Sequence, residues 1–482
     1  ITVPAIKSDV VLVQNDLNLK NFVATMGLGE VTGDVNIAID TQTITGLASA
    51  KDLFVSDFIP GIPTVGSADI KAIRIWGKLA APTLSAVISS EDLIVAGYEV
   101  DQVDGDIHFT NNILTLNNLT ARAREGQLNG SGTLDIGTMA TEGSLELENL
   151  PLDRVPVDRS TFDLRGNISG ALTVASQDGT NWVGQGTIKP SDVNLNNFNA
   201  GNGSFQLSLA GDIVSLHGGI GSTAGFAEVT QMSYNLTDQV LLPSEILVSN
   251  LGVAEALLTV SNKIETDNRQ IRRILDTLSG TLSADLTIQG PISDILVDVK
   301  SAKVTEFAAL GQPQGEISAS GSWRKESWTL TQSSWRRGLG VAFVRGSSDS
   351  VEGFNLQGDL TNFDPSVATL FFEDAPEIGA LLTSSFILSG KGDDIEGRGT
   401  LNIRTIQVRG KNDQLVEVPV SLDSQEIELN DGSISAKANV SFDGLAGQLT
   451  ATIPLSIFDP KPAGKFEAEI VAEDRPISDL EK

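Results

Sequence analysis

Hydrophobic and polar residues alternate along most of the chain. In the stretch GQLTATIPLSI, Leu449, Ala451 and Ile453 fall on one side, and polar residues fall on the other. Residues 434–442 (ISAKANVSF) and 281–288 (TLSADLTI) repeat this alternation. Strict alternation with a period of two predicts β-strands that have one apolar face and one face in water.

Turn dipeptides separate many of these alternating stretches. Asp-Gly and Asn-Gly favour the positive φ angles of tight hairpins. They occur at Asp104-Gly105, Asn129-Gly130, Asp178-Gly179, Asp431-Gly432 and Asp443-Gly444. Because strands follow one another at steps of about 10 residues, we expect an all-β fold with about 40 antiparallel strands.

Two sequence markers recur at long, similar intervals. Leu114-Thr115-Leu116 returns as Val214-Ser215-Leu216, Trp328-Thr329-Leu330 and Ile427-Glu428-Leu429, with spacings of 100, 114 and 99 residues. The second marker is Leu147, Leu247, Leu360 and Ile470, with spacings of 100, 113 and 110 residues. Such self-similarity predicts one continuous, elongated array of stacked units over residues 1–482. The approximate units are 1–70 (partial), 71–157, 158–258, 279–370 and 383–482.

Two segments break the alternation. Apolar residues at spacings of three and four predict an amphipathic helix over residues 253–278, and a weaker helical pattern covers 364–382. Both segments directly follow the second marker. We expect them to cover the open end of a sheet, and the alternative is a helix that lies on a membrane surface.

Composition narrows the range of functions. The chain has 33 basic and 62 acidic residues, a net charge of −29, which argues against binding to nucleic acid. It has no cysteine, so disulfides and thiolate chemistry are excluded. No run of about 20 apolar residues occurs, so we expect no transmembrane segment in this piece, with any membrane anchor outside it.

The search for catalytic residues favours a protein that is not an enzyme. His108 and His217 have no partner at the spacing of a metal site, and we expect both on the face in water. The glycine pairs Gly130 and Gly132, Gly184 and Gly186, and Gly397 and Gly399 open strands rather than helices, so we interpret them as strand-entry bulges and not as phosphate loops. The sequence therefore predicts no catalytic residues, no metal and no cofactor.

The apolar face can be used in two ways. If two sheets close on each other, the product is a sandwich. If one sheet folds over without closing, its apolar face lines a groove. The inward positions are aliphatic and often small, which favours the groove. The candidate lining residues are Leu134, Ile136, Leu145, Leu147, Leu286, Ile288, Leu401, Ile403, Val440, Leu449, Ile453 and Leu455.

The order of short motifs along the predicted strands resembles that of a known family. Segments such as LSGTLSADLTIQGPISDILVDVKSAKVTEFAALGQPQGEISASGSW and QLNGSGTLDIGTMATEGSLELENLPLDRVP combine a G-x-L strand, a Gly-Pro or Ala-Pro turn (Gly290-Pro291, Ala81-Pro82) and a terminal L-x-L-x-x-L. Over nearly its whole length the chain resembles the central segment of the TamB family, within the AsmA-like superfamily of bridge-like lipid transfer proteins.

The resemblance implies a β-taco, a long U-shaped sheet with a hydrophobic interior, in the periplasm or cell envelope of a diderm bacterium. It implies transport of phospholipids between the inner and outer membranes, with acyl chains on the aliphatic floor. An alternative is a scaffold for outer-membrane protein assembly with a barrel partner of the Omp85 family, and a third is an extracellular adhesive rod. We expect the substitution Leu286→Asp or Ile453→Asp to block transport.

Overall fold

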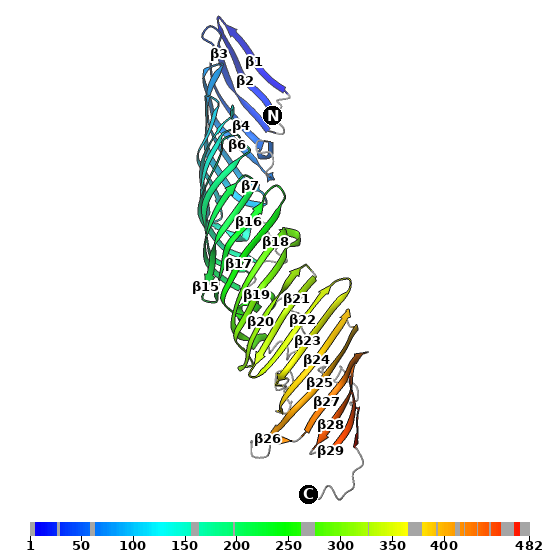
Figure 1. Cartoon of the computed structure of the whole chain (residues 1–482). Helices are drawn as coiled ribbons and strands as arrows, with labels where there is room; N and C mark the ends of the chain where they lie inside the picture. Colours follow the sequence, from blue (N-terminus) through cyan, green and yellow to red (C-terminus); the bar gives the residue numbers. More distant parts are fainter. Residues whose placement is uncertain are drawn as a thin grey trace, which may run out of the picture. The chain divides into compact units, whose positions relative to one another are not determined.

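The computed structural model describes residues 5–26, 29–57, 63–155, 163–195, 198–261, 275–325, 327–364, 378–391, 394–409, 415–418, 420–430, 432–442, 445–454 and 467–472. Within these ranges the chain forms 30 strands of one antiparallel sheet, which confirms the all-β fold of a long β-repeat (Figure 1). The expected number of 40 is wrong because many strands exceed ten residues; β25 (Asp394–Arg409) has 16.

The chain divides into two compact units. Unit 1 comprises Ile1–Thr223 with Glu228–Val240, and unit 2 comprises Ala224–Ala227 with Leu241–Lys482. The strands of unit 1 are β1 (Ala5–Val13), β2 (Asp16–Met26), β3 (Gly29–Ala38), β4 (Thr43–Phe54), β5 (Thr64–Val65), β6 (Ser67–Lys78), β7 (Ala81–Val95), β8 (Tyr98–Thr110), β9 (Ile113–Ala123), β10 (Gly126–Asp135), β11 (Thr141–Pro151), β12 (Leu164–Ser176), β13 (Trp182–Leu195), β14 (Phe198–Ala210), β15 (Ile213–Ser222) and most of β16 (Gly225–Asn235).

Unit 2 contains the remaining strands. They are β17 (Val240–Gly252), β18 (Ser279–Pro291), β19 (Leu296–Ala309), β20 (Gln312–Arg324), β21 (Ser327–Arg337), β22 (Gly340–Asp349), β23 (Gly353–Phe363), β24 (Ile378–Lys391), β25, β26 (Leu415–Val418), β27 (Val420–Asn430), β28 (Ser433–Phe442), β29 (Leu445–Pro454) and β30 (Glu467–Ala472). Short helical turns η1 (Val55–Asp57), η2 (Leu152–Arg154) and η3 (Ile292–Asp294) interrupt the two series of strands.

Most strands pair with the next strand along the chain. In unit 1 this holds from β1 to β4 and from β6 to β15, while β4 pairs with β6 and the short β5 pairs with β7. In unit 2 it holds from β18 to β26 and from β27 to β30, and β25 also pairs with β27. Each unit is therefore a meander of local hairpins.

The second sequence marker follows the strand order. Leu147, Leu247, Leu360 and Ile470 lie on β11, β17, β23 and β30. In counting strands across the sheet, β26 and β27 are taken as one position, because both pair with β25. On this count each of the four marker strands is six strands from the next. The first marker keeps the same step on β9, β15 and β21, but its fourth copy, Ile427, ends β27 rather than opening β28. That fourth copy is therefore not structurally equivalent to the other three.

A left-handed bulge lies next to the second marker, at the asparagines that stand two residues after Leu147 and Leu360. Asn149 and Asn362 have φ angles of 50° and 49°, and the register shifts between Leu147 and Leu150 on β11. Asn tolerates this conformation better than most residues. The bulge adds one residue, so Leu147 and Leu150 face the same side although they are three positions apart. The Asn149 backbone N–H donates to Ser169 Oγ at 3.0 Å.

The predicted helices are only partly within the described residues. Helix α1 (Val253–Ser261) begins where the first one was expected, but 262–274 lie outside the described residues, and the chain is strand again from Ser279. The second prediction, 364–382, falls largely on 365–377, which also lie outside them. Its end is wrong, because residues from Ile378 form β24 and pair with β25. Their backbone groups are satisfied across strands rather than within a helix.

Two of the predicted Gly turns are wrong as well. Gly105 lies inside β8 and Gly130 lies inside β10. The turn at Asp178 is confirmed: Gly179 has a φ of 74°, and backbone N–H groups of Thr180 and Asn181 donate to Asp178 Oδ1, both at 2.9 Å. These donors hold the pKa of the Asp178 carboxyl well below its usual range. Residues 443–444 lie outside the described part of the chain.

Candidate functional site: the apolar face of the sheet

Rows of apolar residues cross the strands in register. In unit 1, Leu145 on β11 pairs with Leu172 on β12, which pairs with Gly186 on β13. The same row continues through Leu207 on β14 to Leu216 on β15. Since strands lie about 4.8 Å apart, such a row forms a continuous apolar strip at right angles to the strands.

Unit 2 contains rows of the same kind. Ile403 on β25 pairs with Leu422 on β27, and Leu422 pairs with Val440 on β28. A parallel row joins Ile434 on β28 to Ile453 on β29. The alternation seen in the sequence therefore gives one apolar face that is maintained from strand to strand within each unit.

Ten of the twelve candidate lining residues lie on this face and are half-buried. They are Leu134, Leu145, Leu147, Leu286, Ile288, Leu401, Ile403, Val440, Leu449 and Ile453. Ile136 is different, because it follows the end of β10 and is 52% exposed. Leu455 lies outside the described residues. The acidic residues between the leucines of β11, Glu146 and Glu148, are exposed on the other face.

The partial burial of these side chains agrees with the large solvent-accessible surface area of the chain. The accessible area is 29578 Å². A single compact protein of this mass exposes about 17,000 Å², and two separate compact halves about 21,000 Å². Of the fifteen buried apolar residues in the described part of the chain, only four form a cluster, Ala50, Leu53, Ile73 and Ala86 on β4, β6 and β7, and the others are spread over both units. Elsewhere, much of the aliphatic surface stays within reach of a ligand.

Glycines on the apolar face make room for neighbouring leucines. A Cβ atom at Gly130 would lie 2.8 Å from Leu145 Cδ2, and one at Gly397 would lie 2.5 Å from Leu388 Cδ2. At Gly186 it would overlap with Leu172 Cδ2 and the carbonyl oxygen of Ala171. The leucine side chains thus lie flat over glycines of the next strand. This packing keeps the face low and smooth.

The interpretation of the glycine pairs as strand-entry bulges is therefore wrong for one pair. Gly184 and Gly186 lie within β13, and the register with β12 and β14 is continuous on both sides of them. Gly397 and Gly399 also lie inside β25, but there the register with β27 shifts between Gly399 and Leu401, and at the first pair the register with β9 shifts between Gly130 and Gly132. Their role is to leave space beside large side chains, a role that period-2 patterning alone does not reveal.

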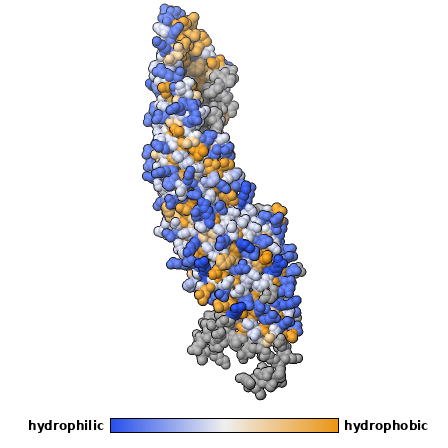
Figure 2. Space-filling model, viewed as in Figure 1, coloured by the Kyte–Doolittle hydropathy of each residue, from blue (hydrophilic) through white to orange (hydrophobic). Residues whose placement is uncertain are grey.

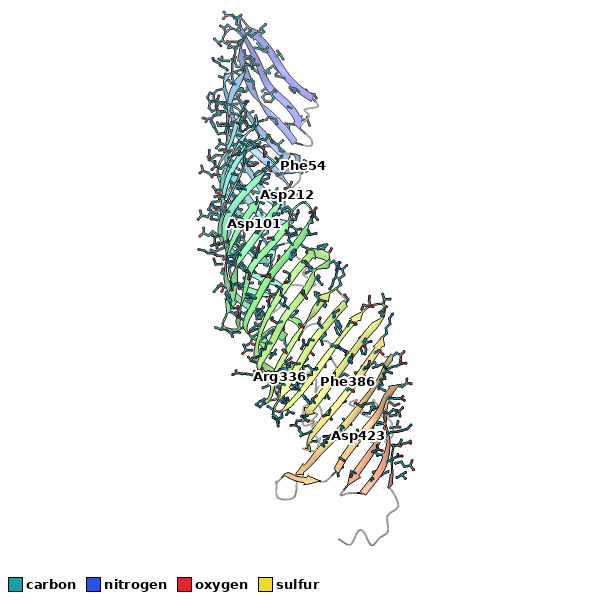
Figure 3. The ribbon with its side chains drawn as sticks, in the orientation of Figure 1. Phe54, Asp101, Asp212, Arg336, Phe386 and Asp423 are labelled. Atoms are coloured by element: carbon teal, nitrogen blue, oxygen red, sulfur yellow. The ribbon has the colours of Figure 1, made fainter. Side chains whose placement is uncertain are left out.

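A polar clamp holds one rim of unit 1. After β11 the chain turns through η2, where Arg154 Nη1 donates to Asp101 Oδ1 at 2.8 Å and to the Glu99 carbonyl at 2.9 Å (Figure 3). Tyr98 Oη donates to the Pro151 carbonyl at 3.1 Å. Burial raises the pKa of the Tyr98 phenol, and the Arg124 backbone N–H and Arg154 lower the pKa of Asp101. The clamp ties the start of β8 to the end of β11.

The histidines lie on the polar face, as expected. His217 Nδ1 lies 2.7 Å from the Thr230 carbonyl oxygen, and the His108 ring is 6.3 Å from the ring of Trp76. Among the residues that the structure describes, no cluster of three or more His, Asp or Glu could hold a metal ion. No helix in the described ranges is long and apolar enough to cross a membrane.

Comparisons with known proteins do not add a family assignment. No protein family, curated protein or solved structure matches this chain.

Proposed function

We propose that the chain is a passive, bridge-like conduit for phospholipids between the inner and outer membranes of a diderm bacterium, and that it performs no catalysis. The observation that carries this proposal is the aliphatic face, which stays in register from strand to strand within each unit and is only half-buried. The sequence segments that resemble the TamB family support phospholipid as the ligand and the periplasm as the location.

In this proposal the acyl chains lie against the apolar face and the head groups stay in water. Each methylene removed from water stabilises the complex by about 0.8 kcal/mol. A low floor, with leucines flat over glycines, offers similar contacts at successive positions. A chain can then slide without crossing a high barrier. The left-handed bulges bend the strands, and we propose that this bending folds the sheet into the U-shaped groove of a β-taco.

A pair of variants on one strand tests the conduit. Ile453→Asp places a carboxylate on the apolar face of β29, and Thr452→Asp places one on the exposed face next to it. Ile453→Asp is expected to reduce both co-purified phospholipid and transfer of a fluorescent phosphatidylethanolamine between vesicles, whereas Thr452→Asp is expected to reduce neither. Leu286→Asp and Ser283→Asp form a second pair on β18.

Mass spectrometry of the purified chain measures how many phospholipid molecules are bound per protein. Stoichiometric phospholipid in the unaltered protein and its loss in Ile453→Asp support the conduit. Normal transfer by both apolar-face variants would contradict it.

A scaffold for outer-membrane protein assembly is the second candidate, and exposed apolar residues of β1 favour it. Within the described residues β1 pairs only with β2, and its Ile6, Val10 and Leu12 are 66%, 63% and 62% exposed. Figure 2 shows hydrophobic residues gathered over these N-terminal strands. Exposed apolar side chains that gather on a surface can mark a contact with another protein chain. Crosslinks from β1 to nascent barrel strands, or to an Omp85-family barrel, without bound lipid would favour this candidate.

A further inference from the structure

The polar face of unit 1 carries an unbroken ladder of uncharged polar side chains. Five direct cross-strand pairings connect β10 to β15, and one hydrogen bond adds β16, so the ladder crosses seven consecutive strands. Its members are Ser131, Ser144, Thr173, Gln185, Ser208, Ser215 and Ser233. At about 4.8 Å between strands, the ladder runs for about 29 Å at right angles to them.

Two hollows lie on this ladder. The first has a volume of about 510 Å³ and extends from Thr115 on β9 to Gln185 on β13. The second has a volume of about 850 Å³ and extends from Ala171 on β12 to Gln231 on β16. Both are lined by Thr173 and Gln185, so they form one continuous depression, which we call the polar trough.

The trough retains free hydrogen-bonding groups. Ser131 and Ser144 hydroxyl oxygens lie 3.1 Å apart, and those of Ser215 and Ser233 lie 2.9 Å apart, so in each pair one hydroxyl donates a hydrogen bond to the other. By contrast, the side chains of Gln185, Thr187, Gln206 and Ser208 have no hydrogen-bond partner among the described residues. Amide and hydroxyl groups both donate and accept, so they match a ligand that also does both.

Charge is almost absent from the trough. Among its lining residues only Glu142 carries a formal charge, although the chain as a whole has 62 acidic residues and a net charge of −29. The surrounding negative field repels polyanions, and the neutral lining offers no ion pair to a charged ligand. An uncharged ligand rich in hydroxyl groups fits this combination.

An aromatic ring extends the same face. Trp76 on β6 is 41% exposed on the polar side, and its ring is 6.3 Å from that of His108. His108 pairs with Thr115, which lines the trough. An exposed indole offers a flat apolar surface against which the C–H face of a sugar ring can pack. The ladder supplies the hydrogen bonds for the hydroxyls.

We propose that the polar trough binds an uncharged, unbranched glycan chain, which lies across strands β10–β16. Successive sugar rings advance by a distance close to the strand spacing, so each ring meets a new rung of the ladder. The site is on the opposite face from the proposed lipid path and does not depend on it.

Unit 2 has a shorter ladder of the same kind. Thr383, Asn402, Asp423, Asn439 and Gln448 pair in succession from β24 to β29, and Asp423 lines two adjoining hollows of about 620 and 470 Å³ (Figure 3). Here the carboxylate of Asp423 and the guanidinium of Arg404 replace two neutral groups. We therefore expect the neutral glycan to prefer unit 1.

Binding of defined oligosaccharides to the full chain tests the proposal. The probes are hexamers of β-1,4-linked glucose and of β-1,4-linked N-acetylglucosamine, with heparin as a polyanion, measured by calorimetry. At least one neutral hexamer is expected to bind, and heparin is not. The double variant Gln185→Ala/Gln206→Ala is expected to weaken that binding at least tenfold. Gln102→Ala, which removes an exposed amide of β8 outside the trough, is expected to change it less than twofold.

Tryptophan fluorescence locates the ligand independently. Trp76→Phe is expected to remove most of the fluorescence change that the glycan causes, although four of the five tryptophans remain. The proposal is overturned if neither hexamer binds, if the double variant and Gln102→Ala bind equally well, or if the trough takes up extended peptides in preference to glycans. Thermal unfolding of each variant identifies any loss of binding that comes from misfolding.

Discussion

The two faces of the sheet are built on one backbone but differ in how neighbouring rows are filled. On the apolar face, leucines alternate with glycines across strands, as in Leu172 beside Gly186, and large side chains lie flat. On the polar face the next row, Thr173 beside Gln185, lines a hollow, and the Thr173 hydroxyl donates to the Gln185 carbonyl while the Gln185 amide faces the hollow. The same pairing register between strands therefore aligns the side chains on both faces. A substitution is expected to alter only the face toward which its side chain points.

The largest expected effect comes from filling a glycine position on the apolar face. In Gly186→Ala the new methyl overlaps with Leu172 and with backbone, so we expect the free energy of unfolding to fall by about 2–3 kcal/mol. Gly143→Ala is the matched control, because its Cβ would lie 3.5 Å from the nearest atom, an ordinary contact. Urea unfolding followed by circular dichroism measures both.

Equal destabilisation by the two substitutions would show that glycine in these strands serves the backbone rather than side-chain space. The proposed smooth floor would then lose its physical basis.

A smaller effect is expected at the bulges that keep the apolar face continuous. Asn149→Val puts a β-branched residue at a φ of 50°, and we expect a loss of about 1–2 kcal/mol. Asn149→Gly keeps the geometry and is expected to change stability by less than about 0.5 kcal/mol. Thermal unfolding of the two variants separates backbone strain from the loss of the side chain. Similar losses in both would mean that the amide, not the φ angle, stabilises the bulge.

The strand pattern was the part of the fold that the sequence could predict well. Alternation in 445–454 and 433–442 identifies strands and faces, because side-chain direction has a period of two. It does not give the register between strands. Gly105 and Gly130 looked like hairpin turns, since Asp-Gly and Asn-Gly are the strongest local turn signals. Only the neighbours, such as Leu145 over Gly130, show that the glycine belongs inside a strand.

The sequence predicted on which face of the sheet the candidate lining residues lie. It did not predict where each strand ends, and therefore not which of these residues remain within a strand. Leu134 and Ile136 have the same spacing as any pair on one face, yet β10 ends at Asp135 and leaves Ile136 exposed. The polar trough was not predicted at all. Its Ser, Thr and Gln residues read individually as an ordinary face in water, and the ladder exists only through pairing between strands. The dipeptides Asn149-Leu150 and Asn362-Phe363, which closely follow the second marker, were a usable signal for the bulges, because Asn tolerates a positive φ.

The smallest expected effect concerns the rim where the two faces meet. Asp101 accepts hydrogen bonds from Arg154 and from the Arg124 backbone N–H, and its pKa is lowered in the folded state. A lowered folded pKa contributes stability that is present above the unfolded pKa of about 4 and is lost as pH falls through the folded value. Because Asp101 is largely exposed, we expect less than about 1 kcal/mol. Asp101→Asn should therefore lower stability at pH 7, and this loss should shrink as pH falls below the unfolded pKa and through the folded one, as measured by urea unfolding at a series of pH values. A difference that persists unchanged at low pH would mean that the clamp acts through packing rather than through the charge of Asp101.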